Sequence, residues 1–146
     1  MVAFFVFESL IPIIDFLVKF WIQNNVHEHT VFPTFLPFLS ITYVKNFGAA
    51  LSLFWGGRYF FIVASVLAIL LILYFVFIKK TRNKLFLLGS AFIVGGGIGN
   101  LIDRIYLGYV VDYLKLSFFG PVCNISDYFI TFGVILFAFY LLTKKD

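Results

Sequence analysis

Four long apolar stretches constrain the fold of this chain more than any other feature. They cover about residues 2–22, 59–78, 85–104 and 125–142, each close to the roughly 20 residues with which a helix crosses a bilayer. Because 62% of the residues are hydrophobic and only 12% are charged, a water-soluble core of this size could not bury the apolar surface. The sequence therefore predicts an all-α membrane protein with four transmembrane helices, formed by residues 1–146 as one domain.

Basic residues cluster in the turn 79–84 and in the tail 144–145. Positive charge collects on the cytoplasmic side of membrane proteins, so we expect both termini in the cytoplasm and the segments 23–58 and 105–125 outside. Neither cluster is interleaved with polar side chains that could read bases. The net charge of +4 therefore indicates membrane orientation, and no nucleic-acid partner.

The two outer segments contain runs that differ from ordinary loops. Residues 41–54 are rich in β-branched and aromatic side chains, and residues 109–119 partly alternate apolar and polar positions. Both runs predict short strands on the membrane surface, which would form a small β-containing extracytoplasmic region. Trp21, Trp55 and Tyr59 fall at the expected outer boundary, where amphipathic rings favour the headgroup layer.

Two aspartates, Asp112 and Asp127, lie in short polar patches beside the third and fourth stretches. A carboxylate next to hydrocarbon is costly unless it is paired or used. Two carboxylates a few ångströms apart cannot both ionise cheaply, so a pair would supply the proton acceptor and the proton donor that peptide hydrolysis requires. The alternative is structural: Asp127 would cap a helix with Asn124 and Ser126, and Asp112 would be a solvated strand residue.

The third stretch ends in a polar and glycine-rich run. Asn100, Asp103 and Arg104 share one helix face by their i, i+3 and i+4 spacing. Arg104 would either hold a substrate carbonyl or lipid headgroup, or pair with Asp103. Gly95 and Gly99 form a small-xxx-small pair that favours close approach of another helix.

The first stretch carries Glu8, Asp15 and Lys19 on one helix face. Asp15 and Lys19 are spaced for an i, i+4 ion pair, which lowers the free energy of keeping both near lipid. A structural role is favoured for all three residues.

Other chemistries fit the sequence less well. His27-Glu28-His29 lacks the helical histidine spacing of a zinc peptidase, and Cys123 has no histidine near it in the sequence. Lys115 and Ser117 would face the same side of a strand without pointing at each other, which disfavours a Ser/Lys dyad. We therefore expect neither a metal nor a cofactor.

Taken together, the motifs resemble the bacterial lipoprotein signal peptidase family, also called signal peptidase II. Four blocks match in order along the chain. They are D-x-x-x-K from Asp15 to Lys19, N-x-G-A-A-x-S from Asn46 to Ser52, G-N-x-x-D-R from Gly99 to Arg104 followed by Gly108-Tyr-Val-Val-Asp112, and the N-x-A-D-like block from Asn124 to Asp127. One such block is a weak signal, whereas four in this order on four predicted spans are specific.

The resemblance implies an aspartyl endopeptidase of the bacterial cytoplasmic (inner) membrane, with its active site at the outer face. It would remove signal peptides from diacylglyceryl-modified prolipoproteins by cutting before the lipidated cysteine, without a metal, and globomycin-type cyclic peptides would inhibit it. Asp112 and Asp127 would be the catalytic pair, and Asp15 and Lys19 would be structural. The residues that shape the site or hold the substrate would be Asn46, Gly48, Asn100, Arg104 and Asn124, with Asp103 orienting Arg104.

The chain departs from the usual family pattern at four positions. Ser126 replaces a common alanine, Cys123 stands where an aromatic residue often precedes the asparagine, and Tyr128 replaces a small polar residue. Phe47 replaces a small residue such as threonine. Both carboxylates are retained, so the departures bear on substrate preference and inhibitor fit.

Three alternatives differ from this reading. A small transporter would place polar residues near the bilayer midplane in matching halves, whereas here they collect at one membrane face. A presenilin-type protease would carry Y-D and G-x-G-D within its spans, and this sequence lacks both. The third alternative is a family member that binds lipoproteins without cutting them. It stays open because of the departures beside Asp127.

Overall fold

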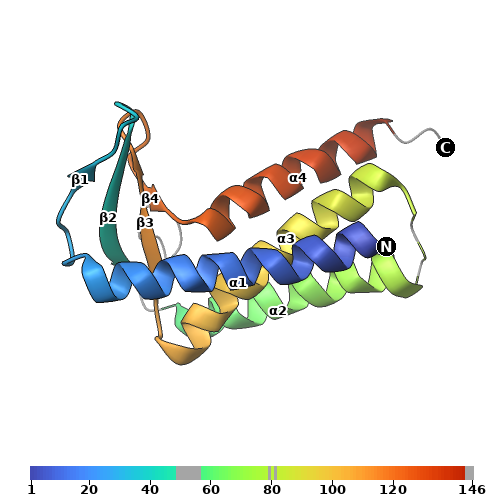
Figure 1. The fold of residues 1–146 in the computed structure, drawn as a ribbon. Helices are drawn as coiled ribbons and strands as arrows, with labels where there is room; N and C mark the ends of the chain where they lie inside the picture. The colour runs from blue at the N-terminus through green and yellow to red at the C-terminus, as the bar shows by residue number, and fades with distance from the viewer. Residues whose placement is uncertain (49–56, 79, 81, 144–146) are drawn as a thin grey trace.

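Helices make up most of the described chain, and a small sheet lies across one end of them (Figure 1). The computed structural model describes residues 1–48, 57–78, 80 and 82–143. The helices are α1 (Val2–Asn25), α2 (Arg58–Leu73, continued by the π-helical turn η2, Tyr74–Ile78), α3 (Lys84–Tyr106) and α4 (Ile125–Thr143). Each apolar stretch is therefore helical, with ends within a few residues of the predicted ones.

Three of the described helices are long and apolar enough to cross a membrane, namely α2 with η2, α3 and α4. No residue of α2 is buried, which is the expected pattern for a helix that lipid surrounds. Helix α1 has 24 residues, but it carries Glu8, Asp15 and Lys19. The prediction of four spans is thus confirmed for three helices, and the crossing of α1 stays a prediction.

Helix α3 is the central helix and packs against α1, α2 and α4. Its glycines allow these close contacts. A Cβ atom on Gly95 would lie 3.1 Å from Ile11 Cβ of α1, and one on Gly96 would lie 2.9 Å from Ile130 Cγ1 of α4. On Gly99 a Cβ atom would lie 2.8 Å from Asp15 Oδ2. The predicted close approach of another helix at Gly95 and Gly99 is therefore confirmed with α1, and Gly99 also lies against Ser126 of α4.

The sheet has four antiparallel strands in the order β1-β2-β3-β4. They are β1 (Phe32–Pro33), β2 (Leu39–Asn46), β3 (Val110–Leu116) and β4 (Val122–Cys123). The two predicted strand regions thus correspond to β2 and β3, which pair with each other. Strand β2 ends at Asn46, and residues 49–54 of the predicted region, with Trp55, lie outside the described residues.

An irregularity in β2 sets which side chains meet across the sheet. The pairing with β3 shifts between Ile41 and Val44, after which Val44 lies opposite Asp112 and Asn46 lies opposite Val110. Because side chains two residues apart point to the same face of a strand, Asn46 shares a face with Asp112. This register brings an amide to the diagonal position beside the carboxylate.

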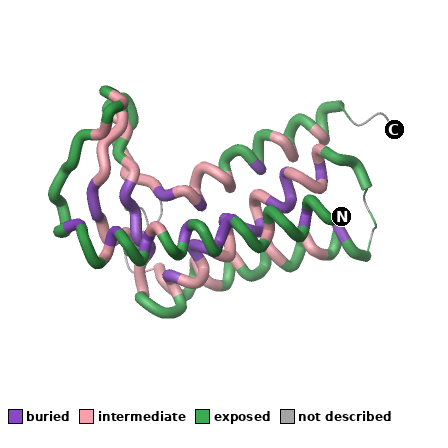
Figure 2. Tube along the Cα trace, in the orientation of Figure 1, coloured by how far each residue is buried: buried purple, intermediate pink, exposed green. Residues whose placement is uncertain are grey.

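Buried residues are concentrated on α1, on α3 and in the parts of β2 and β3 around residues 42–43 and 110–113 (Figure 2). Helices α2 and α4 are largely exposed or half-buried. One apolar cluster joins the end of α1 to the sheet and contains Ile22, Val26, Tyr43, Val111 and Tyr113. A second cluster, containing Phe4, Val76, Phe86 and Ala91, lies near the chain termini. Two buried polar residues of α1, Asp15 and Lys19, occur between the clusters along the chain. Other buried polar residues lie on α3, the sheet and the start of α4, among them Asn100, Asp103, Asp112 and Asn124.

Candidate active site

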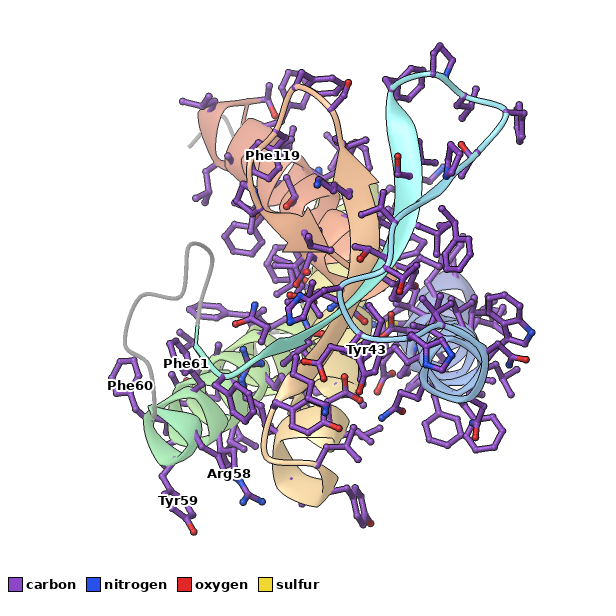
Figure 3. All side chains as sticks on the ribbon, turned by 90° about the vertical axis from the view of Figure 1, so that its left-hand side faces the viewer. Tyr43, Arg58, Tyr59, Phe60, Phe61 and Phe119 are labelled. Carbon is purple, nitrogen blue, oxygen red and sulfur yellow. The ribbon has the colours of Figure 1, made fainter. Side chains whose placement is uncertain are left out.

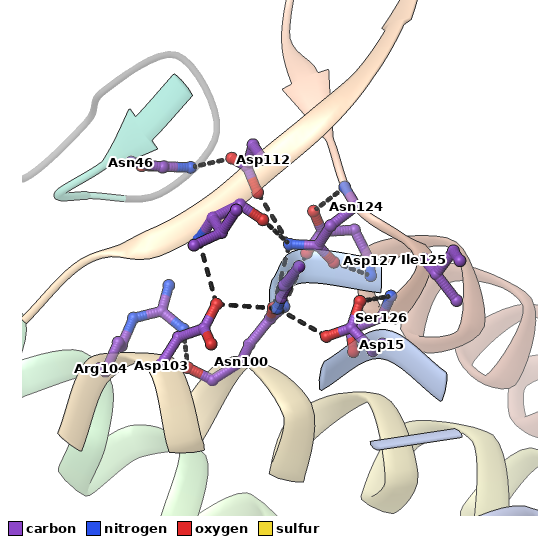
Figure 4. A network of polar contacts seen from close by, with 12 residues as sticks. Asp15, Asn46, Asn100, Asp103, Arg104, Asp112, Asn124, Ile125, Ser126 and Asp127 are labelled. Carbon is purple, nitrogen blue, oxygen red and sulfur yellow. Dashed lines mark hydrogen bonds and ion pairs between the residues drawn. The ribbon is translucent and has the colours of Figure 1, made fainter. Parts of the chain in front are cut away.

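Asp112 and Asp127 line the same cleft, although they belong to different elements. Asp112 lies on β3, and Asp127 lies in the first turn of α4. The cleft has a volume of about 570 Å³, and both carboxylates contribute to its wall. Figure 4 shows the two acids on either side of Asn124. The structure therefore brings together the two acids that the sequence singled out.

Asp112 is almost completely buried and accepts two hydrogen bonds from amides. Asn46 Nδ2 donates to Asp112 Oδ2 at 2.8 Å, and Asn124 Nδ2 donates to Asp112 Oδ1 at 2.7 Å. Burial and the neighbouring Asp127 charge raise the pKa of Asp112 to about 7, against the lowering effect of the two amides. The structural alternative of a solvated strand residue is wrong, because Asp112 has only 2% of its surface exposed.

Asp127 is held by one side chain and by the start of its own helix. Asn100 Nδ2 donates to Asp127 Oδ1 at 2.8 Å, and the backbone N–H of Asn124 donates to Asp127 Oδ2 at 3.0 Å. In return, the backbone N–H of Asp127 donates to Asn124 Oδ1 at 2.9 Å. This reciprocal pair is a capping box. The capping role predicted as an alternative is therefore real, and it leaves Asp127 in the cleft wall.

Arg104 reaches the cleft from the end of α3. Its Nη2 donates to Gly48 O at 3.3 Å and its Nη1 to Asn100 O at 3.4 Å. Its guanidinium carbon lies 5.1 Å from the centre of the Phe61 ring, which is a cation–π distance. A guanidinium has five N–H donors, so among the described residues these two carbonyls take only part of its capacity, and the remaining donors could bind a ligand in the cleft.

Asp103 forms no ion pair with Arg104 in the described structure, so that alternative is wrong, and a role of Asp103 in orienting Arg104 stays a prediction. Asp103 Oδ2 instead lies 2.9 Å from Lys19 Nζ and accepts from the backbone N–H of Val111 at 3.0 Å. The physical reason is the close packing of α1 against α3, which brings the Lys19 ammonium to the Asp103 side of the helix. Asp103 thus ties α3 to both α1 and β3.

Asp15 and Lys19 form the predicted ion pair, at 2.6 Å, and both side chains are buried. Lys19 Nζ also donates to Asn100 Oδ1 at 3.0 Å. The backbone N–H of Ser126 donates to Asp15 Oδ1 at 3.4 Å. The pair therefore connects α1 to the residues that hold Asp127, a connection that the i, i+4 spacing alone did not indicate.

Two residues that support the site had not been identified from the sequence. Arg58 Nε donates to Arg104 O at 2.8 Å and its Nη2 to Ile105 O at 2.7 Å, so that Arg58 satisfies carbonyls at the end of α3. Figure 3 places Arg58 at the start of α2, beside the end of α3. Tyr113 Oη accepts from the backbone N–H of Ile125 at 3.3 Å, at the start of α4. No local sequence signal links either pair, since the partners lie far apart in the chain.

The remaining candidates do not form reactive groupings among the described residues. Glu28 pairs with Lys45 at 2.9 Å, and no group of three or more metal-binding side chains occurs in the part of the chain searched. Cys123 lines the cleft, but burial and the charges of Asp127 and Asp112 raise its pKa to about 11. A thiol in that state is a poor nucleophile.

The cleft is lined by both polar and apolar side chains. Besides the two acids, its polar lining includes Asn46, Asn100 and Arg104, and its apolar lining includes Phe118, Phe119 and Ile130. Phe119 lies on the connection from β3 to β4, near the start of α4 (Figure 3). Such a cleft can hold an extended polar backbone against donors while apolar groups contact the aromatic wall. Two neighbouring carboxylates there can share one proton and activate water.

Comparison with known proteins gives a consistent result over nearly the whole chain. A family model described as signal peptidase (SPase) II matches residues 8–143. The lipoprotein signal peptidase of Lactobacillus gasseri is 41% identical over 151 residues, which cover 99% of this chain and 96% of that protein. The lipoprotein signal peptidase of Caldicellulosiruptor bescii is 47% identical over 106 residues, covering 73% and 69% respectively.

A solved structure has the same fold. It is a bacterial membrane enzyme determined by the in meso method at 2.3 Å resolution. Its TM-score against this chain is 0.92 at 28% sequence identity, and the match covers 100% of this chain and 94% of the other. The arrangement of helices and sheet is therefore shared with a membrane enzyme along the full length of the chain.

Proposed function

This chain belongs to the signal peptidase II family, and we propose that it is an aspartyl endopeptidase that matures lipoproteins. Its substrate is a diacylglyceryl-modified prolipoprotein, and the cut falls before the lipidated cysteine. The observation that carries the aspartyl assignment is the shared cleft of Asp112 and Asp127, each held by amide donors. Amide donors stabilise a carboxylate without neutralising it, as an acid–base pair requires.

The reaction proceeds through one proton shared by the two acids. The ionised carboxylate removes a proton from water as the water oxygen bonds to the scissile carbonyl carbon, and the protonated carboxyl gives its proton to the carbonyl oxygen. The tetrahedral intermediate then breaks its C–N bond. The acid that took the water proton gives it to the departing amine, and the other carboxylate takes back its proton from a hydroxyl of the intermediate as the carbonyl forms again. Nothing beyond water is consumed, and no metal participates.

Arg104 and the asparagines position the reacting groups. The spare donors of the Arg104 guanidinium bind a carbonyl oxygen of the substrate backbone, and Asn46, Asn100 and Asn124 hold the carboxylates in place. Gly48 contributes its carbonyl oxygen to the placement of Arg104. The cleft that Asp112 and Asp127 line receives the signal peptide in extended form.

The site lies at the outer face of the bacterial cytoplasmic membrane, with α1 as the fourth span and both termini in the cytoplasm. Supporting this orientation, the start of α1 and the end of α4 lie at the end of the bundle away from the sheet (Figure 1). The basic residues Lys80, Arg82 and Lys84 follow η2 at that same end; Lys79, Lys144 and Lys145 lie outside the described residues. A diacylated substrate is anchored in the membrane, so its cleavage site stays near the headgroup level.

A reconstituted assay tests this function. Purified protein is incubated with a synthetic diacylglyceryl prolipoprotein and with the same peptide lacking the lipid. We expect release of the signal peptide from the lipidated substrate alone, and inhibition by a globomycin-type cyclic peptide. Equal cleavage of both peptides would contradict the lipoprotein assignment, and inhibition by a chelator would contradict the two-aspartate chemistry.

A further inference from the structure

Lys19 makes more contacts than an ion pair with Asp15 needs. Its side chain is 2% exposed, and its ammonium lies 2.6 Å from Asp15 Oδ2, 2.9 Å from Asp103 Oδ2 and 3.0 Å from Asn100 Oδ1. An ammonium has three N–H donors, so these three acceptors use its full capacity. The third acceptor belongs to the residue that holds Asp127.

We propose that Lys19 is a positioning residue of the peptidase, which fixes the amide of Asn100 and thereby holds the Asp127 carboxylate in place. This inference rests on the proposed function. Asn100 Oδ1 accepts from Lys19 Nζ and from Asn124 Nδ2, each at 3.0 Å, while Asn100 Nδ2 donates to Asp127 Oδ1 at 2.8 Å. One oxygen thus faces two donors, and the nitrogen faces the carboxylate.

The charge of Lys19 makes this orientation of Asn100 far more favourable than the flipped one. Rotating the amide by half a turn would place its N–H groups against the buried ammonium and its oxygen against the Asp127 carboxylate. Both contacts would be repulsive, and in a buried site they would be weakly screened. A neutral residue at position 19 removes the first of these repulsive contacts and so weakens the preference for the orientation that faces Asp127.

Lys19 also acts on the acid pair through its charge. Burial and the Asp127 charge raise the pKa of Asp112, and the positive charge of Lys19 is among the influences that lower it. The other ionisable groups around the pair are Asp15 on α1, Asp103 and Arg104 on α3, Tyr113 on β3, Cys123 on β4 and Tyr128 on α4. Removing Lys19 leaves Arg104 as the cation near the pair among the described residues, so the pKa of Asp112 rises further.

The test is the pH profile of kcat/KM for cleavage of a synthetic diacylglyceryl prolipoprotein. Lys19→Gln, which removes the charge, is expected to move the whole profile to higher pH by roughly half a unit, less than a directly paired charge would give. Lys19→Arg keeps the charge but alters the contact with Asn100. It should leave the profile in place while kcat falls about tenfold at nearly unchanged KM.

Lys115→Gln is the matched control, because it removes the same charge from an exposed position on β3. Its profile should coincide with that of the wild type, since exposed charges are screened. A Lys19→Gln profile that does not move, with loss only of melting temperature, would overturn the proposal. If Lys19→Gln does not accumulate, an unchanged kcat in folded Lys19→Arg overturns it. A wild type that leaves the substrate uncut contradicts the proposed function instead.

Discussion

The side-chain amide of Asn124 donates a 2.7 Å hydrogen bond to Asp112 Oδ1, and this amide is completely buried. The same residue begins α4 through its capping box with Asp127. One asparagine therefore sets the start of a helix and connects two acids from different elements. The side chain and backbone of Asn124 that cap α4 therefore also hold the two acids in place.

Replacing Asn124 separates these two roles. Asn124→Ser keeps a good N-cap but loses the amide donor to Asp112, whereas Asn124→Ala loses both. We expect both variants to lose most activity, and the alanine variant to be less stable than the serine variant by about 1 kcal/mol. Cleavage rates and thermal unfolding in detergent measure the two effects. An active Asn124→Ser protein would show that the bridge to Asp112 is dispensable.

Asp112→Asn should stabilise the protein at high pH while it removes activity. The folded-state pKa of about 7 lies above the ordinary value of 3.8, because burial and the Asp127 charge raise it. The stability from the protonated carboxyl is therefore fully present below about pH 3.8 and is lost as the pH rises through about 7. In the variant the amide oxygen at position 112 accepts from one of Asn46 and Asn124, while its NH2 group faces the other donor, as the hydroxyl of the protonated carboxyl does in the wild type. We expect a higher melting temperature than wild type near about pH 8, and a difference that shrinks towards about pH 4.

Ser126→Ala should leave the protein as stable as the wild type or up to about 1 kcal/mol more stable. The Ser126 hydroxyl is buried and has no hydrogen-bond partner among the described residues. Removing it therefore removes the free-energy cost of burying an unpaired hydroxyl. Thermal unfolding and cleavage of the lipidated substrate are the measurements. A clear loss of stability would mean that the hydroxyl makes a bond in the folded protein.

Gly96→Ala and Gly97→Ala form a matched pair on α3 with opposite expected signs. A Cβ atom on Gly96 would lie 2.5 Å from the Ser126 carbonyl oxygen, so the α3–α4 contact must open, at about 2 kcal/mol or more. On Gly97 the nearest atom is Ile69 Cδ1 at 3.5 Å, an ordinary contact. There alanine should stabilise the helix by up to about 1 kcal/mol. Melting temperatures that shift alike would contradict this packing.

The helices could be predicted because the hydrophobicity of a membrane-spanning segment is a property of its own residues and does not depend on tertiary contacts. Hydrophobic length alone located the four helices, and β-branched and aromatic residues located β2 and β3. The two-residue strands β1 and β4 had no such signal, because pairing with a neighbouring strand creates them. The register shift before Val44, which places Val44 opposite Asp112 and Asn46 on the same face, likewise depends on tertiary contacts.

The site residues were predicted less evenly. Carboxylates beside lipid are costly wherever the chain folds, so Asp112 and Asp127 could be identified from their placement, and the family resemblance supplied the asparagines. The partner of Asp103 was not predicted, since spacing offered only Arg104 and the contact with Lys19 depends on how α1 packs on α3. Arg58 was missed because its acceptors are backbone carbonyls, which leave no trace in a sequence.

The most direct test of the central claim is cleavage of a diacylglyceryl prolipoprotein by Asp112→Asn and by Asp127→Asn, each compared with the wild type. Membrane insertion and thermal unfolding establish that each variant is folded. The account predicts that both folded variants lose cleavage, with rates at least about a thousandfold below that of the wild type. A folded variant of either residue that cleaves at a rate near the wild type would contradict it.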